Sequence, residues 1–400
     1  MKNASNTGND RPASTAPEPK RSDTAGSHRW RLRTGSVAMS VAAAAALLAA
    51  CGSSSGTSSS ATTAGSSATS SAAGSTATTG GTSSATAAAL AYFKGKTITL
   101  IAPDGPGGDY DLYARILAPA FGQYLGATVN VENVPGGGTI VGGNQIASAA
   151  PNGLTLGLFS VGGDEASVIE HHPGQNFTLT NLSWIGQPGT SPSVFLTQPN
   201  SGVTSFAQLL TTKTPINVLD IRNGTGDMLD RVVLGAFGIP NKLLTGFTSV
   251  ATLKQGFLAH DGQFLFENLP PFKALIQGNQ AKPLLVTSPA VGVLSGLVTG
   301  VPTLNSELSK VSLSAAQQAA VKEAVSLATL AFDMGGPPGI PAARLTVLRD
   351  AFNAAVTNSA TLAQAAKESE PIDPINGATV AADVAAAVTQ GPSISSYVNG

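Results

Sequence analysis

The residues of this chain that can do chemistry stand in glycine-rich turns between an apolar segment and a predicted helix. The first turn, Pro103–Asp109, holds two prolines and three glycines in seven positions. Thr97–Ile101 before it predicts a buried strand, and a helical pattern begins at Tyr110. A strand, a glycine-rich turn and a helix in this order aim free backbone N–H groups at one point. Such a point binds an oxygen-rich ligand without a charged side chain.

The same arrangement occurs three more times, at Asn133–Ile140, Val161–Asp164 and Arg222–Asp227. Strands that alternate with helices predict βαβ units and a parallel sheet. Loops that follow successive parallel strands lie at one edge of the sheet, where open α/β sheets bind ligands. We therefore expect the first three turns to converge on one crevice. The fourth turn also lies between a predicted strand and a predicted helix, and we assign it to a second lobe.

The folded part, from about residue 94 to residue 400, is long enough for two α/β lobes. Trp184–Gln198 predicts an interrupted strand that leaves the first lobe, and Lys282–Thr287 predicts a strand that crosses back. The predicted first lobe comprises residues 94–197 and 326–400, and the predicted second lobe comprises residues 198–325.

An apolar run from Val37 to Ala50 follows three arginines, at positions 29, 31 and 33. A membrane span needs about 20 apolar residues, so this shorter run is typical of a signal peptide instead. The run ends in Leu48-Ala-Ala-Cys-Gly52, which resembles the bacterial lipobox, where the cysteine is lipidated. We predict a signal peptide with a disordered polar n-region over residues 1–50 and a lipid on Cys51, which anchors the protein outside the cytoplasm.

Residues 52–89 are almost entirely Ser, Thr, Ala and Gly. Such a segment buries too little apolar area to offset its ordering entropy, so we predict a flexible tether over residues 51–93. Cys51 is the only cysteine, so its lipidation leaves no thiol for a disulfide, a metal or a nucleophile. The net charge of −1 and a charged fraction of 11% give no basic surface for nucleic acid.

The residue patterns do not favour an enzyme. His171 and His172 are adjacent, so they point in different directions and do not complete the spacing of a zinc site. No Gly-x-Ser-x-Gly turn accompanies His260, and Gly105–Gly108 lacks the spacing of a nucleotide-binding loop. We predict no catalytic residue, no metal and no cofactor. A cell-surface α/β hydrolytic enzyme is the alternative from another class.

The two first turns resemble those of a receptor family, the Bug-type extracytoplasmic solute receptors of tripartite tricarboxylate transporters. The first loop of that family reads roughly Pro-aromatic-x-x-Gly-Gly-x-x-Asp-x-x-Ala-Arg, and this chain matches it in register at Pro103, Gly107, Gly108, Asp111, Ala114 and Arg115. The second loop and the segment after it match at Val131, Asn133, Pro135, Gly136, Gly138, Thr139, Pro151, Asn152, Gly153, Thr155 and Leu156. Val301–Leu304 and Pro337–Pro341 are also similar, so the resemblance spans residues 94–390.

The resemblance implies a type-II periplasmic-binding-protein fold, in which two Rossmann-like lobes close on a small organic anion. It implies a solute receptor, monomeric and lipid-anchored, that delivers a carboxylate-bearing molecule to membrane permease subunits. A receptor that senses a ligand for a membrane sensor kinase is the alternative. Carried over to this chain, the ligand-binding residues are Pro103, Asp104, Gly107, Gly108, Asp109, Tyr110, Asp111, Pro135, Gly136, Gly137, Gly138, Thr139, Ser160, Arg222, Gly224, Thr225, Gly226, Asp227 and Asn268.

Three acidic residues depart from the family pattern. Asp104 stands where an aromatic residue is usual, and Asp109 and Asp227 stand where small or hydroxylated residues are common. Carboxylates in a crevice oppose an anionic ligand unless they are paired. We therefore expect these acids to set the specificity, so a zwitterionic, cationic or neutral solute competes with a dicarboxylate. Arg222 is the candidate countercharge for the ligand, and its pairing with Asp227 or Asp230 is the alternative, whereas Arg115 is expected to be a packing or salt-bridge residue.

Overall fold

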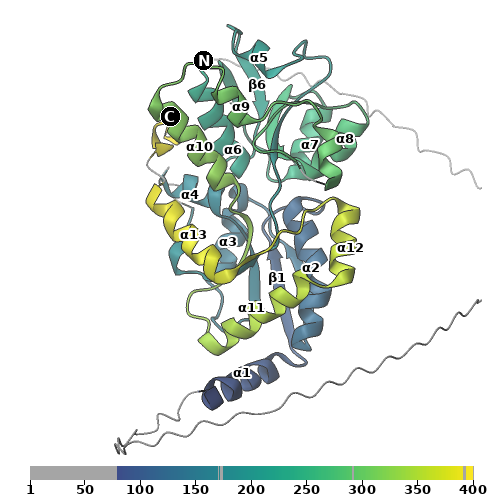
Figure 1. Cartoon of the computed structure of the whole chain (residues 1–400), viewed down its shortest axis with the longest axis vertical. Helices are drawn as coiled ribbons and strands as arrows, with labels where there is room; N and C mark the ends of the chain where they lie inside the picture. Colours follow the sequence, from purple (N-terminus) through teal and green to yellow (C-terminus); the bar gives the residue numbers. More distant parts are fainter. Residues whose placement is uncertain (1–78, 170, 172–173, 291, 391–392, 400) are drawn as a thin grey trace, which may run out of the picture. The chain divides into compact units, whose positions relative to one another are not determined.

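Two mixed sheets flanked by helices make up the part of the chain that the structure describes (Figure 1). This computed structural model describes residues 79–169, 171, 174–290, 292–390 and 393–399. These residues fall within one compact unit, Gly74–Gly400. The predicted signal peptide, Cys51 and the tether up to residue 78 lie outside the described residues.

The first sheet has six strands in the order β11-β4-β10-β3-β1-β2. Their bounds are β1 Thr97–Ala102, β2 Thr128–Asn133, β3 Thr155–Ser160, β4 Ser183–Gln187, β10 Ala331–Gly336 and β11 Ile375–Asn376. β1 pairs in parallel with β2 and β3, whereas β10 is antiparallel to β3 and β4. The prediction of a parallel sheet is therefore correct for the three strands that carry the glycine-rich turns, and wrong for the rest.

The second sheet has five strands in the order β7-β6-β8-β5-β9. Their bounds are β5 Ser193–Thr197, β6 Ile216–Leu219, β7 Asn241–Leu244, β8 Phe264–Asn268 and β9 Lys282–Val286. β6 is parallel to β7 and β8, and β5 is antiparallel to β8 and β9.

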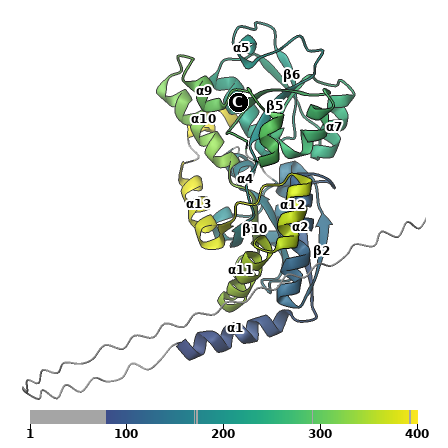
Figure 2. The same ribbon diagram turned by 45° about the vertical axis from the view of Figure 1, so that its right-hand side comes forward.

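Helices cover both faces of each sheet (Figures 1 and 2). The α-helices are α1 Thr79–Phe93, α2 Asp109–Leu125, α3 Ile140–Ala147, α4 Val161–Ile169, α5 Phe206–Leu209, α6 Thr225–Leu229, α7 Val250–Leu258, α8 Lys273–Gln277, α9 Leu304–Leu308, α10 Ala315–Ala328, α11 Ala342–Val356, α12 Ser359–Glu368, α13 Gly377–Gln390 and α14 Ser395–Val398. Short 3₁₀ segments are η1 Gly137–Thr139, η2 Leu179–Asn181, η4 Pro270–Phe272 and η5 Gly292–Leu297, and η3 Asp230–Leu234 is a π-helical turn. No helix among the described residues is both long and apolar enough to cross a membrane.

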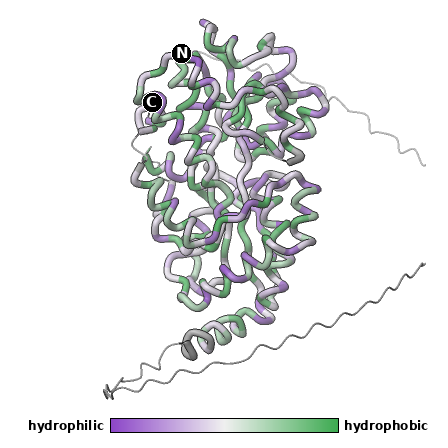
Figure 3. Tube along the Cα trace, in the orientation of Figure 1, coloured by the Kyte–Doolittle hydropathy of each residue, from purple (hydrophilic) through white to green (hydrophobic). Residues whose placement is uncertain are grey.

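The alternation of side chains along β1 explains its place inside the first sheet. Ile98 and Leu100 pack on one face with α2 and α11, and Ile101 packs on the other with α3. β5 does the same in the second sheet, where Phe195 and Leu196 belong to opposite cores. Figure 3 shows hydrophobic residues along these central strands.

The predicted strand over Trp184–Gln198 is two strands in different sheets. β4 belongs to the first sheet and β5 to the second, so the chain crosses between Gln187 and Ser193. Two prolines in the crossing, Pro188 and Pro192, lack the N–H that a continuous strand requires. The predicted lobe boundary after residue 197 is thus wrong by one strand. β9 is an edge strand of the second sheet, so the prediction that it crosses back is also wrong.

The predicted tether is wrong at its end, because α1 covers Thr79–Phe93. Its last turns contain Ala87–Ala89 and Ala91, and alanine has the highest helix propensity. Ala89 and Phe93 are buried, and the guanidinium carbon of Arg344 in α11 lies 3.6 Å from the centre of the Tyr92 ring. Packing against α11 therefore holds this segment as a helix.

Candidate functional site

A cavity with about 490 Å³ of empty space, partly open to solvent, lies where the loops of the two sheets meet. The first sheet contributes the loops after β1 and β2 and Ser160, the last residue of β3, at the edge that the parallel order of these strands predicts. Val161–Asp164, predicted as a third turn at the crevice, forms the start of α4 and does not line the cavity. The second sheet contributes the loop after β6, the start of α7 and the end of β8. The lining residues are Pro103, Asp104, Asp109, Tyr110, Gly138, Thr139, Ser160, Ile221, Gly224, Thr225, Thr248, Val250, Glu267 and Asn268.

Asp104 connects the first loop to the second sheet. Its Oδ1 accepts hydrogen bonds from the backbone N–H of Gly105 at 2.6 Å and of Val250 at 3.3 Å. Its carbonyl accepts a hydrogen bond from Nδ2 of Asn133 at 3.0 Å. A Cβ on Gly105 would lie 2.9 Å from the Cβ of Ser249, so this turn packs directly against the start of α7.

Gly138 brings the second loop against the loop after β6. Its φ of +65° favours glycine, and a Cβ here would lie 2.3 Å from the carbonyl carbon of Asn223 and 2.5 Å from the amide nitrogen of Gly224. Beside this contact, the hydroxyls of Ser160 and Thr225 are 2.7 Å apart. The two loops are therefore in direct contact.

Burial and mutual repulsion perturb the acids that line the cavity. Burial raises the pKa of Asp104 from 3.8 to about 6. Burial and the charge of Asp104 raise the pKa of Asp109 to about 8. Burial and the charges of Asp104 and Asp109 raise the pKa of Glu267 to about 8. Among the described residues, the lining includes no lysine, arginine or histidine that would oppose these shifts by direct contact.

Asp111 does not line the cavity, although it lies in the same helix turn. Its carboxylate accepts the N–H of Gly107 at 3.0 Å and pairs with Arg115 at 2.8 Å. Burial raises the pKa of Asp111, but these hydrogen bonds outweigh it and leave the pKa below its ordinary value. Both residues therefore hold the first turn in shape, and Arg115 forms the salt bridge expected of it.

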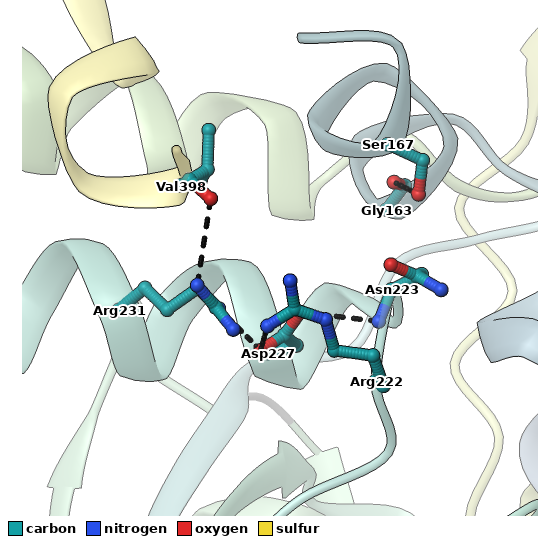
Figure 4. Close-up of polar contacts among 7 residues, drawn as sticks. All are labelled: Gly163, Ser167, Arg222, Asn223, Asp227, Arg231 and Val398. Carbon is teal, nitrogen blue, oxygen red and sulfur yellow. Dashed lines mark hydrogen bonds and ion pairs between the residues drawn. The ribbon is translucent and has the colours of Figure 1, made fainter. Parts of the chain in front are cut away.

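Asp227 lies outside the cavity lining, and its carboxylate is paired with arginine side chains. Its Oδ2 accepts the N–H of Asn223 at 3.1 Å, and its Oδ1 accepts a hydrogen bond from Nε of Arg231 at 2.6 Å (Figure 4). Arg222 lies 3.8 Å from the same oxygen, and Arg231 also donates to the carbonyl of Val398. This cluster links the loop after β6 to α14, so Asp227 has a structural partner, and it is not among the residues that line the cavity.

Ten of the predicted ligand-binding residues line the cavity: Pro103, Asp104, Asp109, Tyr110, Gly138, Thr139, Ser160, Gly224, Thr225 and Asn268. Nine others lie outside its lining: Gly107, Gly108, Asp111, Pro135, Gly136, Gly137, Arg222, Gly226 and Asp227. The ligand-binding residues expected from the sequence do not include Ile221, Thr248, Val250 or Glu267, which also line the cavity. The hydroxyl pair that caps α7, Ser249 and Thr252, was a signal that could have found Val250.

The described histidines do not form a metal site or a catalytic pair. No group of three or more His, Cys, Asp and Glu in the described part of the chain is arranged to hold a metal. His260 Nδ1 lies 2.6 Å from Oε1 of Gln198, at the far end of β5 from the cavity.

Comparisons with known proteins agree with this architecture. Residues 113–219 match the model of the tripartite tricarboxylate transporter family receptor. A UPF0065 protein of Bordetella pertussis is 34% identical over 120 residues, which are 30% of this chain and 36% of that relative. The chain therefore matches about a third of the length of this curated relative.

Solved structures extend the likeness to the whole fold. The periplasmic binding protein BugD has a TM-score of 0.60 at 19% identity, covering 74% of this chain and 95% of that chain. MatC from Rhodopseudomonas palustris has a TM-score of 0.61 at 15% identity, covering 75% and 99%. The predicted resemblance and the type-II periplasmic-binding-protein fold are confirmed. The partial match to a receptor family agrees with the prediction of a binding protein rather than an enzyme.

Proposed function

We propose, from its likeness to tripartite tricarboxylate transporter receptors, that this chain captures a small carboxylate-bearing solute and delivers it to the membrane subunits of such a transporter. The observation that carries the proposal is the cavity between the two sheets, lined by two loops and the end of β3 of the first sheet and by residues of the second. The same loops touch through Gly138 and through the Ser160–Thr225 hydroxyl pair. Solute held there is enclosed by both lobes, which strengthens its hydrogen bonds by excluding water.

The hydroxyl pair and the second loop would hold the carboxylate. Gly138 and Thr139 line the cavity at the end of the second glycine-rich turn and bring no acidic side chain into the lining. Ser160 and Thr225 add hydroxyl donors on the facing side. MatC was solved with bound malate, a dicarboxylate, and this supports a carboxylate group in the solute.

Calorimetric titration of the purified protein tests the proposal. The titrants are malate, longer dicarboxylates and compounds that combine amino and carboxylate groups. Saturable heat from a carboxylate-bearing compound, lost when Thr225→Val removes a hydroxyl from the cavity, is the expected result. Heat that is unchanged in this variant would move the binding site away from the cavity.

Lipid anchoring belongs to the same proposal. The lipobox-like sequence around Cys51 would fix the receptor to the membrane, and the segment up to α1 would let it reach the transporter. Cys51→Ser should move the protein from the membrane fraction to the soluble extracytoplasmic fraction. Equal membrane association of both forms would refute the anchor and leave the receptor function intact.

A further inference from the structure

We propose that the solute also carries a positively charged amino group, which lies against Asp104, Asp109 and Glu267. This inference rests on the proposed function, because it names the class of solute that the same cavity takes. The solute is then an amino carboxylate rather than a dicarboxylate.

Three carboxyl groups from three elements line the cavity. Asp104 lies in the loop after β1, Asp109 in the first turn of α2 and Glu267 near the end of β8. No basic side chain stands among the described lining residues. A second carboxylate of a solute would face these like charges at short range, whereas an ammonium group would be attracted by all three.

Buried oxygens of two of these acids lack a hydrogen bond of ordinary geometry. Asp109 is only 3% exposed, and neither of its carboxyl oxygens has such a bond among the described residues, although the side chains of Asn268 and Glu370 lie close enough to lower its pKa. Asp104 is 6% exposed, and its Oδ2 also has no hydrogen-bond partner among the described residues. Buried acceptors without donors are unusual in folded proteins. An ammonium group brings three N–H donors and no acceptor, which is what these oxygens lack.

The charged groups around the cluster do not fill this role. Lys254 in α7 lowers the pKa of Asp104 and Asp109 from a distance, while its Nζ donates to the carbonyl of Pro271 at 3.3 Å. Asp111 adds negative charge near Asp104, whereas burial and the charge of Asp109 raise the pKa of Glu370 well above its ordinary value, so Glu370 does not supply a positive charge either. The raised pKa values of the cavity acids agree with a missing countercharge.

An organic cation fits better than a metal ion. The described acids do not form a group arranged to hold a metal. The lining also includes Gly138, Thr139, Ser160 and Thr225, which supply hydroxyl and backbone groups, although Thr139 donates its hydroxyl to the buried carboxyl of Asp164. The lining therefore combines three carboxyl groups with uncharged polar groups, which suits a molecule with an amino group and a carboxylate.

The inference is tested by thermal unfolding of the full chain at pH 8 with two fragments of the solute, methylammonium for the amino group and acetate for the carboxylate. The salts are methylammonium chloride, sodium acetate and, as the control, sodium chloride, all at equal ionic strength. A fragment with a Kd of about 10 mM, present at roughly 100 mM, should raise Tm by about 3 °C. We expect methylammonium to stabilise the wild type and not Asp109→Asn. Asp104→Asn is measured alongside, so the readout does not depend on the folding of one variant. Asp261→Asn, the same change at an exposed acid away from the cavity, should keep the full effect.

Each outcome decides a different claim. An acetate effect without a methylammonium effect overturns the amino group and leaves the proposed receptor function. A methylammonium effect that persists in both cavity variants overturns the assignment to these acids. No effect of either fragment contradicts the amino group and the carboxylate-binding cavity together.

Discussion

Gly138→Ala is the change that tests whether the two lobes must close through the second loop. The new Cβ would lie 2.3 Å from the carbonyl carbon of Asn223 and 2.5 Å from the carbonyl oxygen of Arg222, and both are backbone atoms. Ordinary contacts of a Cβ begin at 3.4 Å. The loops would therefore have to separate by about 1 Å, an estimate from contact geometry in close-packed interiors.

Two further effects raise the free energy of the Gly138→Ala variant when the two loops are in contact. A non-glycine residue at a φ of +65° costs roughly 1 kcal/mol. Separation of the loops also weakens the hydrogen bond between Ser160 and Thr225, worth about 1 kcal/mol, and admits water to the cavity. The strain lowers the stability of the protein with and without solute, so it does not count in the affinity. From the weakened hydrogen bond and the lost contacts of the solute, we expect a loss of at least about 1.4 kcal/mol, or about tenfold in affinity.

Gly238→Ala is the matched control. Gly238 has the same φ of +65°, but nothing lies within 4 Å of its added Cβ. Both variants should lose similar stability in chemical unfolding, whereas only Gly138→Ala should lose affinity for the solute and fail to contract in solution scattering when solute is added. Equal affinity and equal contraction in the two variants would refute the role of the second loop in closure.

The acids and the buried ion pair give two further predictions. The pKa of Asp104 is higher in the folded protein than in the unfolded chain, so the folded state holds its proton more tightly and stability falls as pH rises. From the change in pKa from 3.8 to about 6, this residue alone should lower the unfolding free energy by roughly 2 kcal/mol between pH 4 and pH 8. Asp104→Asn should reduce the dependence of the unfolding free energy on pH over this range. A wild-type stability that rises with pH would contradict this prediction. Asp227→Asn should lower the unfolding free energy by about 3 kcal/mol, because it removes the buried carboxylate that pairs with Arg231. Urea unfolding measures it, and a loss below about 0.5 kcal/mol, typical of an exposed pair, would show that the pair is not structural.

The sequence predicts the part of the site that is built from one local pattern. Pro103, Gly138 and Ser160 each lie at or after the end of a parallel strand of the first sheet, so their convergence follows from the order of strands and turns. The glycine-rich pattern did not separate Gly138 from Gly136 and Gly137, because only the approach of Asn223 distinguishes them. That approach is a contact between distant parts of the chain.

The rest of the site depends on packing that no local pattern shows. Val250 reaches Asp104 because α7 begins beside the first loop, 146 positions along the chain. The position of Asp227 in the glycine-rich turn predicted an acid that lines the crevice. Its carboxylate pairs instead with Arg231, one helical turn later. α1 was predicted as a tether from its composition, since the sequence does not show that α11 offers a surface for Tyr92 and Phe93.

Native mass spectrometry of the full chain after incubation with a mixture of organic acids and amino acids tests the central claim most directly. The wild type and Gly238→Ala should each retain one small molecule per chain, and Gly138→Ala should retain none. Retention that is equal in all three proteins, or no retention by the wild type from the whole mixture, would contradict a solute site in the cavity that Gly138 closes.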